Sequence, residues 1–377
     1  MIYHMSFFSD TVLPNKVKRH RDLNAEFTGR LTTRTGVNVM IKKLVIASAA
    51  LLAASTASAQ ADLLDTIKER GELICGTLDY LPGVGFLNDK GEWSGFDVDF
   101  CKAAAAGILG DAKKIKFVST TGANKFPVLE SGEIDLLSRS VTMTTSRETT
   151  LGFDFIGPNH LTGQGFMVHA ETGVKDAKAL DGATICVLSG TVTERYLAEW
   201  FRANGISFSP VAAENSDQMF SMYFDNRCDA VTMEPPYLAI RRSRSENPGG
   251  HVILDNIIAK SFEAPVILEG NPKFREALQW IHWGMVTAEE LGITSANVDD
   301  MVKTSQDPVV RRFLGVDETI GKDMGLPNDF MVSVIKAVGN YGEFYERNLG
   351  QGSILKVSRG MNAPFSMGGA LTAPGWQ

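Results

Sequence analysis

The stretch from residue 72 to residue 118 contains ELICG (Glu72–Gly76), DVDFCKAAAAGIL (Asp97–Leu109) and KIKFV (Lys114–Val118). The first run predicts a short apolar strand, the middle run an alanine-rich helix with an acidic start, and the last run a second strand. A further helix is predicted over Lys125–Ser131 and a further strand over Ile134–Leu137. Strands that alternate with helices predict an α/β domain with a largely parallel sheet.

The same alternation begins again further along the chain. The predicted elements are a strand over Ala183–Leu188, a helix over about 192–204, a strand over Ser207–Val211, a helix over Ser216–Phe224 and a strand over Cys228–Met233. Between the two runs, Gly157–Gly165 contains the Pro and Gly that are typical of a hinge. We therefore expect two similar α/β lobes joined by a hinge.

The part of the chain after about residue 260 is again mainly helical in pattern. Pro272–Leu291 carries Trp280, Ile281, Trp283 and Met285 at helical spacing, which predicts core packing rather than stacking on a ligand. The tail from residue 340 to residue 377 is rich in Gly and Pro, and we expect it to wrap the first lobe.

The N-terminal region has the features of an export signal. From Met40 the chain runs through Lys42 and Lys43, an apolar stretch to about Ala54 and the small-residue triplet 57–59. We expect residues 40–59 to be a cleaved signal peptide, the mature chain to begin at Gln60, and residues 1–39 to be a mis-assigned upstream extension. An alanine-rich core helix is the alternative for residues 40–59.

Composition and charge exclude several classes of protein. The chain has 377 residues, of which 44% are hydrophobic and 21% charged, as in a folded globular protein. The whole chain has 37 Lys/Arg and 44 Asp/Glu, of which eight and three, respectively, lie in residues 1–59. Residues 60–377 therefore have 29 basic and 41 acidic residues, a net charge of −12. Such a charge argues against nucleic acid as a partner. No later stretch approaches 18 apolar residues, so the mature protein should be soluble.

Four cysteines follow the expected signal peptide: Cys75, Cys101, Cys186 and Cys228. An even count in an exported chain favours disulfides, and four cysteines allow three pairings. We favour Cys75–Cys101 and Cys186–Cys228, because each pair would close a modest loop within one lobe. Four buried free thiols are the alternative. The spacings match no zinc template, and we expect neither a metal nor another cofactor.

Ligands of doubly wound sheets bind at the carboxyl ends of the strands. One such end is followed by SRSVTMTTSRE (Ser138–Glu148), a run of hydroxyls and arginines. A carboxylate ligand requires partners of these types, since a guanidinium binds it in bidentate fashion and hydroxyls donate to it. The alternative is a solvated Ser/Thr turn with a helix N-cap at Ser146 or nearby.

Two further strand ends are candidate sites. SGTVTE (Ser189–Glu194) places a glycine turn before a helix, and a helix N-terminus attracts anions. A plain N-cap with Thr193 or Glu194 in the capping role is the alternative. Glu234 follows the strand Cys228–Met233 and precedes two prolines, so its carboxylate could meet an ammonium group, although a solvated surface glutamate is the commoner case.

Several motifs resemble one known family. They are GEWSGFDVD (Gly91–Asp99), SGEID (Ser131–Asp135), NYGE (Asn340–Glu343) and ERNLGQGS (Glu346–Ser353). Together they resemble the periplasmic substrate-binding proteins of polar amino acid ABC transporters (solute-binding protein family 3), most closely the general L-amino acid-binding branch. The resemblance covers residues 61–377, and all four cysteines fall where that branch has them.

The resemblance implies a two-lobed periplasmic binding protein type II fold with two crossover strands at the hinge. Lobe 1 would consist of residues 60–160 plus 261–377, including a C-terminal extension, and lobe 2 of residues 161–260.

The resemblance also implies roles for particular residues. Arg147 matches the arginine that clamps the ligand α-carboxylate, and Ser140 and Thr142 match polar contacts to the carboxylate or ammonium. Thr191 matches the lobe 2 residue whose backbone caps the carboxylate. Glu234 stands where an aspartate usually holds the ammonium.

Three features of these positions bear on the ligand. Glu234 is one methylene longer than the usual aspartate. Val192 replaces a usual Thr or Ser, which removes a hydroxyl. Tyr80 is the best candidate for the aromatic that covers the ligand side chain.

The implied function is capture of a free L-amino acid in the periplasm by hinge closure and its delivery to the permease subunits of an ABC importer. Charge-assisted bonds contribute about 1.5–3 kcal/mol each, so we expect micromolar or tighter binding. We also expect the protein to be a monomer and not to be an enzyme. A dehydratase-like enzyme on the same fold, or a binding protein for a non-standard amino acid-like ligand, is the alternative. A chemoreceptor partner would use the same pocket.

Overall fold

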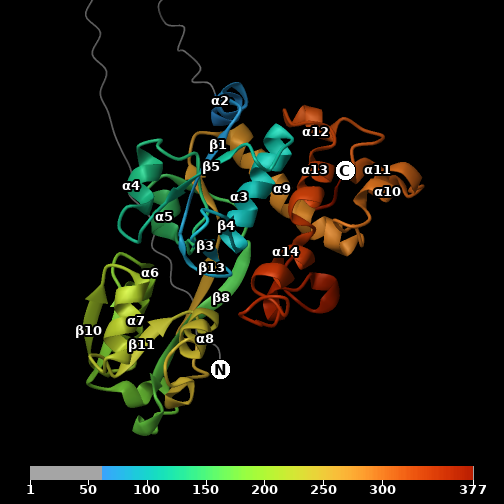
Figure 1. The fold of residues 1–377 in the computed structure, drawn as a ribbon. Helices are drawn as coiled ribbons and strands as arrows, with labels where there is room; N and C mark the ends of the chain where they lie inside the picture. Colours follow the sequence, from blue (N-terminus) through green and yellow to red (C-terminus); the bar gives the residue numbers. More distant parts are fainter. Residues whose placement is uncertain (1–61, 377) are drawn as a thin grey trace, which may run out of the picture. The chain divides into compact units, whose positions relative to one another are not determined.

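The computed structural model describes residues 62–376 (Figure 1). The expected N-terminal extension (1–39), signal peptide (40–59) and mature start at Gln60 lie outside the described residues. Between residues 62 and 376 there is no helix with the length and apolar character needed to cross a membrane.

The first lobe is built on a five-stranded sheet in the order β5-β1-β6-β14-β7. The strands are β1 (Leu73–Thr77), β5 (Ile115–Ser119), β6 (Leu136–Leu137), β7 (Phe153–Phe155) and β14 (Val266–Leu268). β1 pairs in parallel with β5 and β6, whereas β14 pairs antiparallel with β6 and β7. The N-terminal half of this lobe therefore forms the parallel sheet that the alternation of strands and helices predicts.

The core of the first lobe lies among helices from both ends of the chain. α3 (Phe96–Leu109) packs with α9 (Pro272–Glu290), α13 (Phe330–Val338) and α14 (Tyr341–Asn348). On α9, Ile281 and Met285 are fully buried in this core, as predicted. Trp280 and Trp283 are half-buried and stack edge to face on each other. Neither tryptophan lines the ligand pocket described below.

The second lobe has its own sheet in the order β10-β9-β11-β8-β12. The strands are β8 (His160–His169), β9 (Ala183–Leu188), β10 (Phe208–Ala213), β11 (Ala230–Met233) and β12 (His251–Ile253). β9 pairs in parallel with β10 and β11, as β1 does with its neighbours in the first lobe. α6 (Val192–Ala203), α7 (Ser216–Phe224) and α8 (Pro235–Ser243) belong to this lobe.

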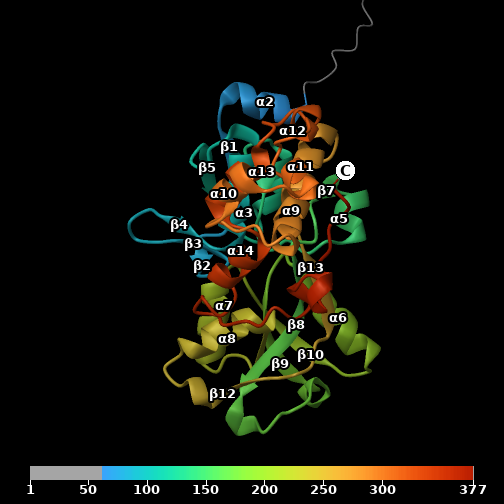
Figure 2. The same ribbon diagram turned by 90° about the vertical axis from the view of Figure 1, so that its right-hand side faces the viewer.

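Two strands carry the chain between the lobes. β8 and β13 (Ala259–Glu263) pair antiparallel over five residues, from His160 opposite Glu263 to Gln164 opposite Ala259. Figures 1 and 2 show β8 running from one lobe into the other. The expected boundaries after residues 160 and 260 fall within these two strands. The two-lobed α/β fold with two crossover strands is therefore confirmed.

Two of the predicted strands are shorter than expected, for the same reason in each lobe. Asp135 precedes β6, and its carboxylate accepts a hydrogen bond from the Ile74 N–H at 2.7 Å and pairs with Arg70. Asp229 precedes β11, and its carboxylate accepts from the N–H of Thr184 at 2.7 Å. In both lobes an aspartate side chain thus satisfies an amide of the neighbouring strand, and the strand proper begins at the next residue.

The four cysteines are joined as favoured from the sequence. Cys75 on β1 is bonded to Cys101 on α3, and Cys186 on β9 is bonded to Cys228 just before β11. No free cysteine remains among the described residues. Each disulfide ties elements of a single lobe, so neither bond crosses the hinge.

The remaining elements are short. The helices are α2 (Leu63–Arg70), α4 (Lys125–Glu130), α5 (Thr145–Thr149), α10 (Val298–Thr304), α11 (Pro308–Phe313) and α12 (Ile320–Asp323). A small sheet is formed by β2 (Tyr80–Leu81), β3 (Gly85–Leu87) and β4 (Trp93–Ser94). Short 3₁₀ turns are η1 (Ala170–Thr172), η2 (Ala177–Leu180), η3 (Pro248–Gly250), η4 (Gly360–Asn362) and η5 (Phe365–Met367).

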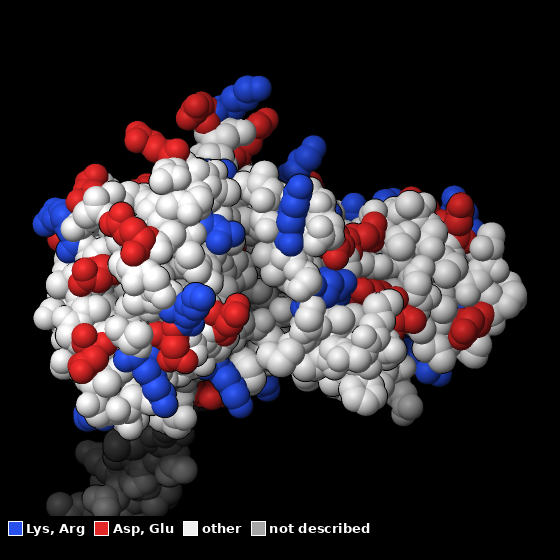
Figure 3. All heavy atoms as spheres, turned by 90° about the horizontal axis from the view of Figure 1, so that it is seen from below, with Lys and Arg blue, Asp and Glu red and all other residues white. Residues whose placement is uncertain are grey.

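The C-terminal tail packs on the first lobe and on the crossover. Trp376 packs edge to face on Trp280 of α9, at 5.1 Å between ring centroids. Asn362 accepts a hydrogen bond from the Leu161 N–H at 2.7 Å and donates to the Leu161 carbonyl at 2.9 Å. On the face drawn in Figure 3, acidic and basic side chains are interspersed rather than gathered into a basic patch.

Candidate functional site

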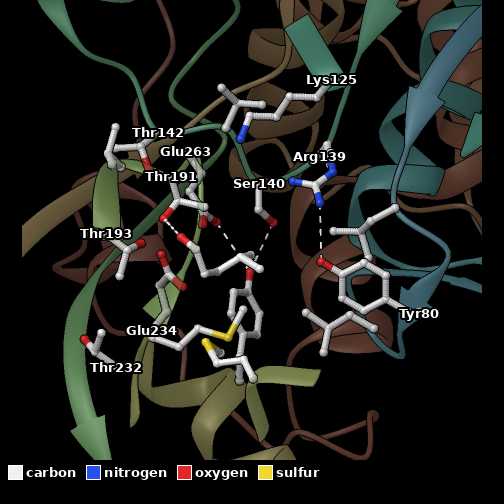
Figure 4. Close-up of a pocket in the computed structure, with 18 of the residues that line it drawn as sticks. Tyr80, Lys125, Arg139, Ser140, Thr142, Thr191, Thr193, Thr232, Glu234 and Glu263 are labelled. Carbon is white, nitrogen blue, oxygen red and sulfur yellow. Dashed lines mark hydrogen bonds between the residues drawn. The ribbon is translucent and has the colours of Figure 1, made fainter. Parts of the chain in front are cut away.

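A pocket lies between the two lobes, near the carboxyl ends of their parallel strands. The lining residues are Leu78, Tyr80, Leu81, Lys125, Arg139, Ser140, Val141, Thr142, Arg147, Leu188, Thr191, Val192, Thr193, Met219, Thr232, Met233, Glu234, Tyr237 and Glu263. Figure 4 shows how they converge from both lobes. All seven ligand-binding candidates from the sequence line this one pocket.

Arg147 is held in place on the short helix α5. Thr144, rather than Ser146, is the N-cap, and its hydroxyl accepts a hydrogen bond from the Arg147 N–H at 3.3 Å. The guanidinium donates to the Thr142 carbonyl at 2.6 Å and lies over the Phe126 ring at 4.9 Å. The side chain is only 7% exposed, and burial lowers the pKa of Arg147 to about 10.

The guanidinium of Arg147 has no acidic partner in the described part of the chain. None of the ion pairs between residues 62 and 376 includes Arg147. A buried cation of this kind is costly unless an anion compensates it. The geometry therefore suits an anionic group that arrives in the pocket.

Ser140 and Thr142 form part of the pocket floor, where their hydroxyls already have protein partners. Ser140 has a positive φ of 47°, which is uncommon for a residue other than glycine. Asp97 holds it there by accepting from the Ser140 N–H at 2.9 Å and hydroxyl at 3.1 Å. The Thr142 hydroxyl is bonded to that of Ser261 at 2.8 Å. Burial raises the pKa of Asp97, while its hydrogen bonds with Ser138 and Ser140 oppose the shift and make this aspartate a structural support of the floor.

Two further cations line the pocket, and the sequence analysis did not single them out. Lys125 is the first residue of α4 and is 4% exposed. Arg139 follows β6 and is 6% exposed. Arg139 donates to the Thr120 carbonyl at 3.2 Å and to the Tyr80 hydroxyl at 3.3 Å. Arg139 lies within the run Ser138–Glu148 after a predicted strand end, so the sequence could have indicated it as a pocket residue. Lys125 lies at the start of a predicted helix, and nothing in the sequence indicated that it lines the pocket.

The second lobe contributes a helix start. Thr191 is the N-cap of α6, and its hydroxyl donates to the Leu188 carbonyl at 2.7 Å instead of capping the helix. α6 consequently has no side-chain cap. Val192 and Thr193, which open the helix, also line the pocket. A helix N-terminus without a capping side chain favours a negatively charged group nearby.

Glu234 faces the pocket from the second lobe. It is the N-cap residue of α8, directly after β11, and is 8% exposed. No other residue in the range 62–376 donates a hydrogen bond to its carboxylate. Burial first, and then the nearby Glu263, raise the pKa of Glu234 to about 8, while His160 opposes the shift. A ligand ammonium would compensate this carboxylate.

A buried pair closes the floor of the pocket at the crossover strands. His160 Nδ1 and the Glu263 carboxylate lie 2.7 Å apart, and the Tyr237 hydroxyl donates to the same carboxylate at 3.4 Å. Tyr237 lies on α8 of the second lobe, and its hydroxyl also lies 3.3 Å from that of Ser140. Sequence reasoning missed this group, because its members are distant in the chain.

The two lobes also approach each other closely between Gly122 and the turn that contains Ser189 and Gly190. A methyl group at Gly122 in the first lobe would lie 3.2 Å from the Ser189 carbonyl oxygen in the second lobe, and one at Gly190 would lie 3.6 Å from the Gly122 carbonyl oxygen. These glycines therefore let the two backbones approach closely. Between residues 62 and 376, no three His, Cys, Asp or Glu side chains gather as a metal site.

Comparisons with known proteins identify solute-binding proteins as relatives of this chain. The family model for bacterial extracellular solute-binding proteins, family 3, matches residues 73–295. The general L-amino acid-binding periplasmic protein AapJ of Rhizobium johnstonii is 44% identical over 339 residues, which is 89% of this chain and 99% of that protein. The glutamate/glutamine/aspartate/asparagine-binding protein BztA of Rhodobacter capsulatus is 42% identical over 335 residues, again 89% and 99% of the two chains.

A solved structure is similar over most of its length. It is an ABC transporter/periplasmic binding protein from Brucella ovis with glutathione bound, which is 44% identical with a TM-score of 0.81. The match covers 84% of this chain and 100% of that one.

Proposed function

The chain belongs to the bacterial extracellular solute-binding proteins of family 3, and from this premise we propose that it captures a free L-amino acid in the periplasm and delivers it to an ABC importer. The observation that carries this proposal is that a guanidinium on one side of the pocket and a carboxyl group on the other side both lack a partner of opposite charge. Arg147 of the first lobe has no acidic partner in the described chain, and Glu234 of the second lobe has no donor from another residue there. An amino acid zwitterion supplies one partner for each.

The proposed mechanism is closure of the two lobes on the ligand. The α-carboxylate binds the Arg147 guanidinium in the first lobe and the N–H groups that open α6 near Thr191 and Val192. The α-ammonium binds Glu234, with Ser140 and Thr142 lining the floor beside it. Because the ligand contacts both lobes only when they are closed, it stabilises the closed state by its differential contacts.

The test uses ligands that lack one of the two charges. The purified protein is titrated by calorimetry with free L-amino acids, with their methyl esters and with their N-acetyl derivatives. We expect binding of free amino acids and a loss of at least about a hundredfold for either derivative, since each removes a charge-assisted contact and leaves a buried charge unpaired. Equal binding of a free amino acid and its ester would contradict the role of Arg147.

A second ligand class has a specific observation in its favour. The Brucella ovis relative was solved with glutathione bound, and glutathione carries a free α-amino acid group at its γ-glutamyl end. We propose that the same grip of Arg147 and Glu234 could hold this end of the peptide. Reduced glutathione, together with opines, betaines and polyamines, therefore belongs in the ligand screen beside the twenty amino acids.

We propose binding without turnover, in contrast to a dehydratase-like enzyme on the same fold. His160, a candidate acid or base at the pocket floor, is engaged by Glu263, and burial lowers the pKa of His160 to about 4. Incubation of the protein with each bound ligand, followed by chromatography, should recover the ligand unchanged. A new product at a rate proportional to protein concentration would establish catalysis instead.

Export, assembly and partners are proposals of the same kind. We propose cleavage before Gln60, a periplasmic monomer, and docking of the two lobes on the permease subunits of the importer. N-terminal sequencing of the exported protein should read from Gln60, and light scattering should give the mass of one chain. Binding to the reconstituted transporter should strengthen when the ligand is added.

A further inference from the structure

The pocket holds more positive charge than one amino acid zwitterion can use. We propose that Lys125 and Arg139, with the hydroxyl of Tyr80, form a second anion subsite that takes a second carboxylate of the ligand. The protein would then select amino acids that carry an acidic group at the end opposite the α-carbon. This inference rests on the proposed function, because it assumes that Arg147 and Glu234 hold the amino acid end.

The three basic side chains come from separate elements of the first lobe and converge on one pocket. Lys125 opens α4, Arg139 follows β6 and Arg147 lies on α5. Each is more than nine-tenths buried. None of the three appears in an ion pair in the part of the chain that the structure describes. Figure 4 shows Lys125 and Arg139 approaching the pocket on the side away from Glu234.

The acids around the pocket do not balance these cations. One carboxyl oxygen of Glu263 has His160 and Tyr237 as partners and the other is buried without one. Burial raises the pKa of Glu263 well above its usual range, so this group does not supply a negative charge. Asp97 accepts from Ser138 and from Ser140. Among the described acids that line the pocket, Glu234 is left without a donor. Two guanidinium ions, together with a lysine that can take up a proton when an anion binds, face one carboxylate that lacks a donor. This set complements a ligand with one ammonium and more than one carboxylate, since buried charges are stable only when they are compensated.

The surroundings of Arg139 suit an acceptor. Its guanidinium is anchored by the Thr120 carbonyl and by the Tyr80 hydroxyl oxygen, both of which only accept from it. The Tyr80 proton is then available to a ligand oxygen, and the guanidinium has further N–H groups beyond the two that are used. Tyr80 was expected to cover the ligand side chain through its ring, and here it would act through its hydroxyl.

The lowered pKa of Lys125 is consistent with a subsite for an anion. Burial first, and then Arg139 and Arg147, lower the pKa of Lys125 to about 6. The groups that face it are those two cations and the Phe126 ring, which lies 5.1 Å from its ammonium. Burial and these two neighbours therefore hold Lys125 largely neutral at pH 7.5. A carboxylate beside it would raise its pKa, and binding would take up about one proton.

The experiment compares ligand pairs that differ only in the second carboxylate. Glutamate and glutamine, and aspartate and asparagine, are titrated by calorimetry into the wild type, Lys125→Met and Arg139→Gln. In the wild type we expect the acids to bind at least about tenfold more tightly than the amides. Each substitution should weaken the acids by about 10- to 100-fold and the amides by less than about threefold, since it removes one charge-assisted contact to the second carboxylate. Glutathione, a γ-glutamyl peptide, is titrated separately into the same three proteins. Its binding shows whether the subsite recognises the carboxylate of a peptide or that of an amino acid side chain.

A second measurement tests whether Lys125 contacts the second carboxylate of the ligand or only supports the protein structure. At pH 7.5, in two buffers of different ionisation enthalpy, glutamate should take up about one proton more than glutamine does, and Lys125→Met should abolish this difference. A purely structural role for Lys125 would not produce it. Thermal unfolding of each variant checks that the protein still folds.

The outcomes distinguish this inference from the proposed function. If the wild type binds acids and amides equally, or if both variants weaken the two classes alike, the second subsite is wrong and the amino acid site stands. If the wild type binds no ligand with a free α-amino acid group, both are wrong. If glutathione alone loses affinity in the variants, the subsite recognises a peptide carboxylate and the amino acid part of the inference is overturned.

Discussion

The two walls of the pocket differ in chemistry and in the way their groups are held. The first lobe presents buried cations, and Arg147 and Arg139 are anchored to carbonyls of their own lobe. The second lobe presents the start of α6, the carboxylate of Glu234 and the thioethers of Met219 and Met233. Charged groups that are pre-positioned lose little entropy on binding. We therefore expect the first wall to supply most of the affinity and the second wall to convert binding into closure.

The largest expected effect comes from removing the central charge of the first wall. Arg147→Ala should lower affinity for every amino acid by at least about a thousandfold, because it removes a bidentate charge-assisted contact and leaves the ligand carboxylate buried without its partner. Calorimetry measures the loss. Arg227→Ala is the matched control, since Arg227 is an exposed arginine of the second lobe that lies outside the pocket. An affinity within threefold of wild type would refute the assignment of Arg147.

Removing the charge of the second wall should have a smaller effect. Glu234→Gln keeps the shape and one acceptor oxygen, so we expect a loss of about 10- to 100-fold in affinity for free amino acids. Glu214→Gln, an exposed glutamate of the same lobe, is the control. If Glu234→Gln weakened binding more than Arg147→Ala does, the second wall would contribute more to the affinity than the first.

The raised pKa of Glu234, about 8, predicts a pH dependence for neutral amino acids such as glutamine. The ligand ammonium favours the ionised carboxylate, so binding lowers the pKa of Glu234 and releases a proton. Affinity should therefore rise between pH 7 and pH 8, by up to about tenfold per pH unit, and level off above the pKa.

Glu263 and His160 face Glu234, and Arg147 and Lys125 line the same pocket, so the wild-type profile alone does not isolate one group. The ratio of wild-type to Glu234→Gln affinity isolates it. A ratio that stays constant from pH 7 to pH 8.5 would show that Glu234 does not titrate in this range.

Contact between the walls should matter less than the charges. Gly122→Val places a branched side chain against the Ser189 carbonyl, where even a methyl group would lie 3.2 Å away. We expect closure to be impeded and affinity to fall by about three- to tenfold, because the neighbouring loop can shift only partly. Small-angle scattering with saturating ligand should show a less compact protein than the wild type. Unchanged affinity and compaction would mean that the lobes need not meet at this point.

The smallest effect is expected at the start of α6. Val192→Thr restores the hydroxyl that resemblance to the family led us to expect, and one added hydrogen bond contributes about 0.5–1.5 kcal/mol net. Affinity for free amino acids should rise by about two- to tenfold. Thr193→Val removes a hydroxyl from the adjacent pocket residue and serves as the comparison. A loss of affinity in Val192→Thr would indicate that the apolar side chain itself contacts the ligand.

The sequence by itself determined the alternation of strands and helices, the two lobes and three of the pocket's key positions. Arg147, Thr191 and Glu234 lie in runs that follow strand ends, where ligands of such sheets bind, and resemblance to the family, rather than spacing, gave each of the three its expected role. The disulfides could be chosen for a similar reason, because each closes a loop within one lobe. The alternation, the strand ends and the disulfide pairs are local inferences, since they depend on periodicity and on residues that are close in the chain.

Only the tertiary structure decided which charges are paired. His160 and Glu263 are separated by 103 positions in the chain and meet because β8 and β13 cross the hinge side by side. That contact engages Glu263, while Lys125 and Arg139 are left facing the pocket without an acid among the described residues. The free energy of a charge in a protein depends on its burial and on its neighbours in space, and the linear sequence contains neither.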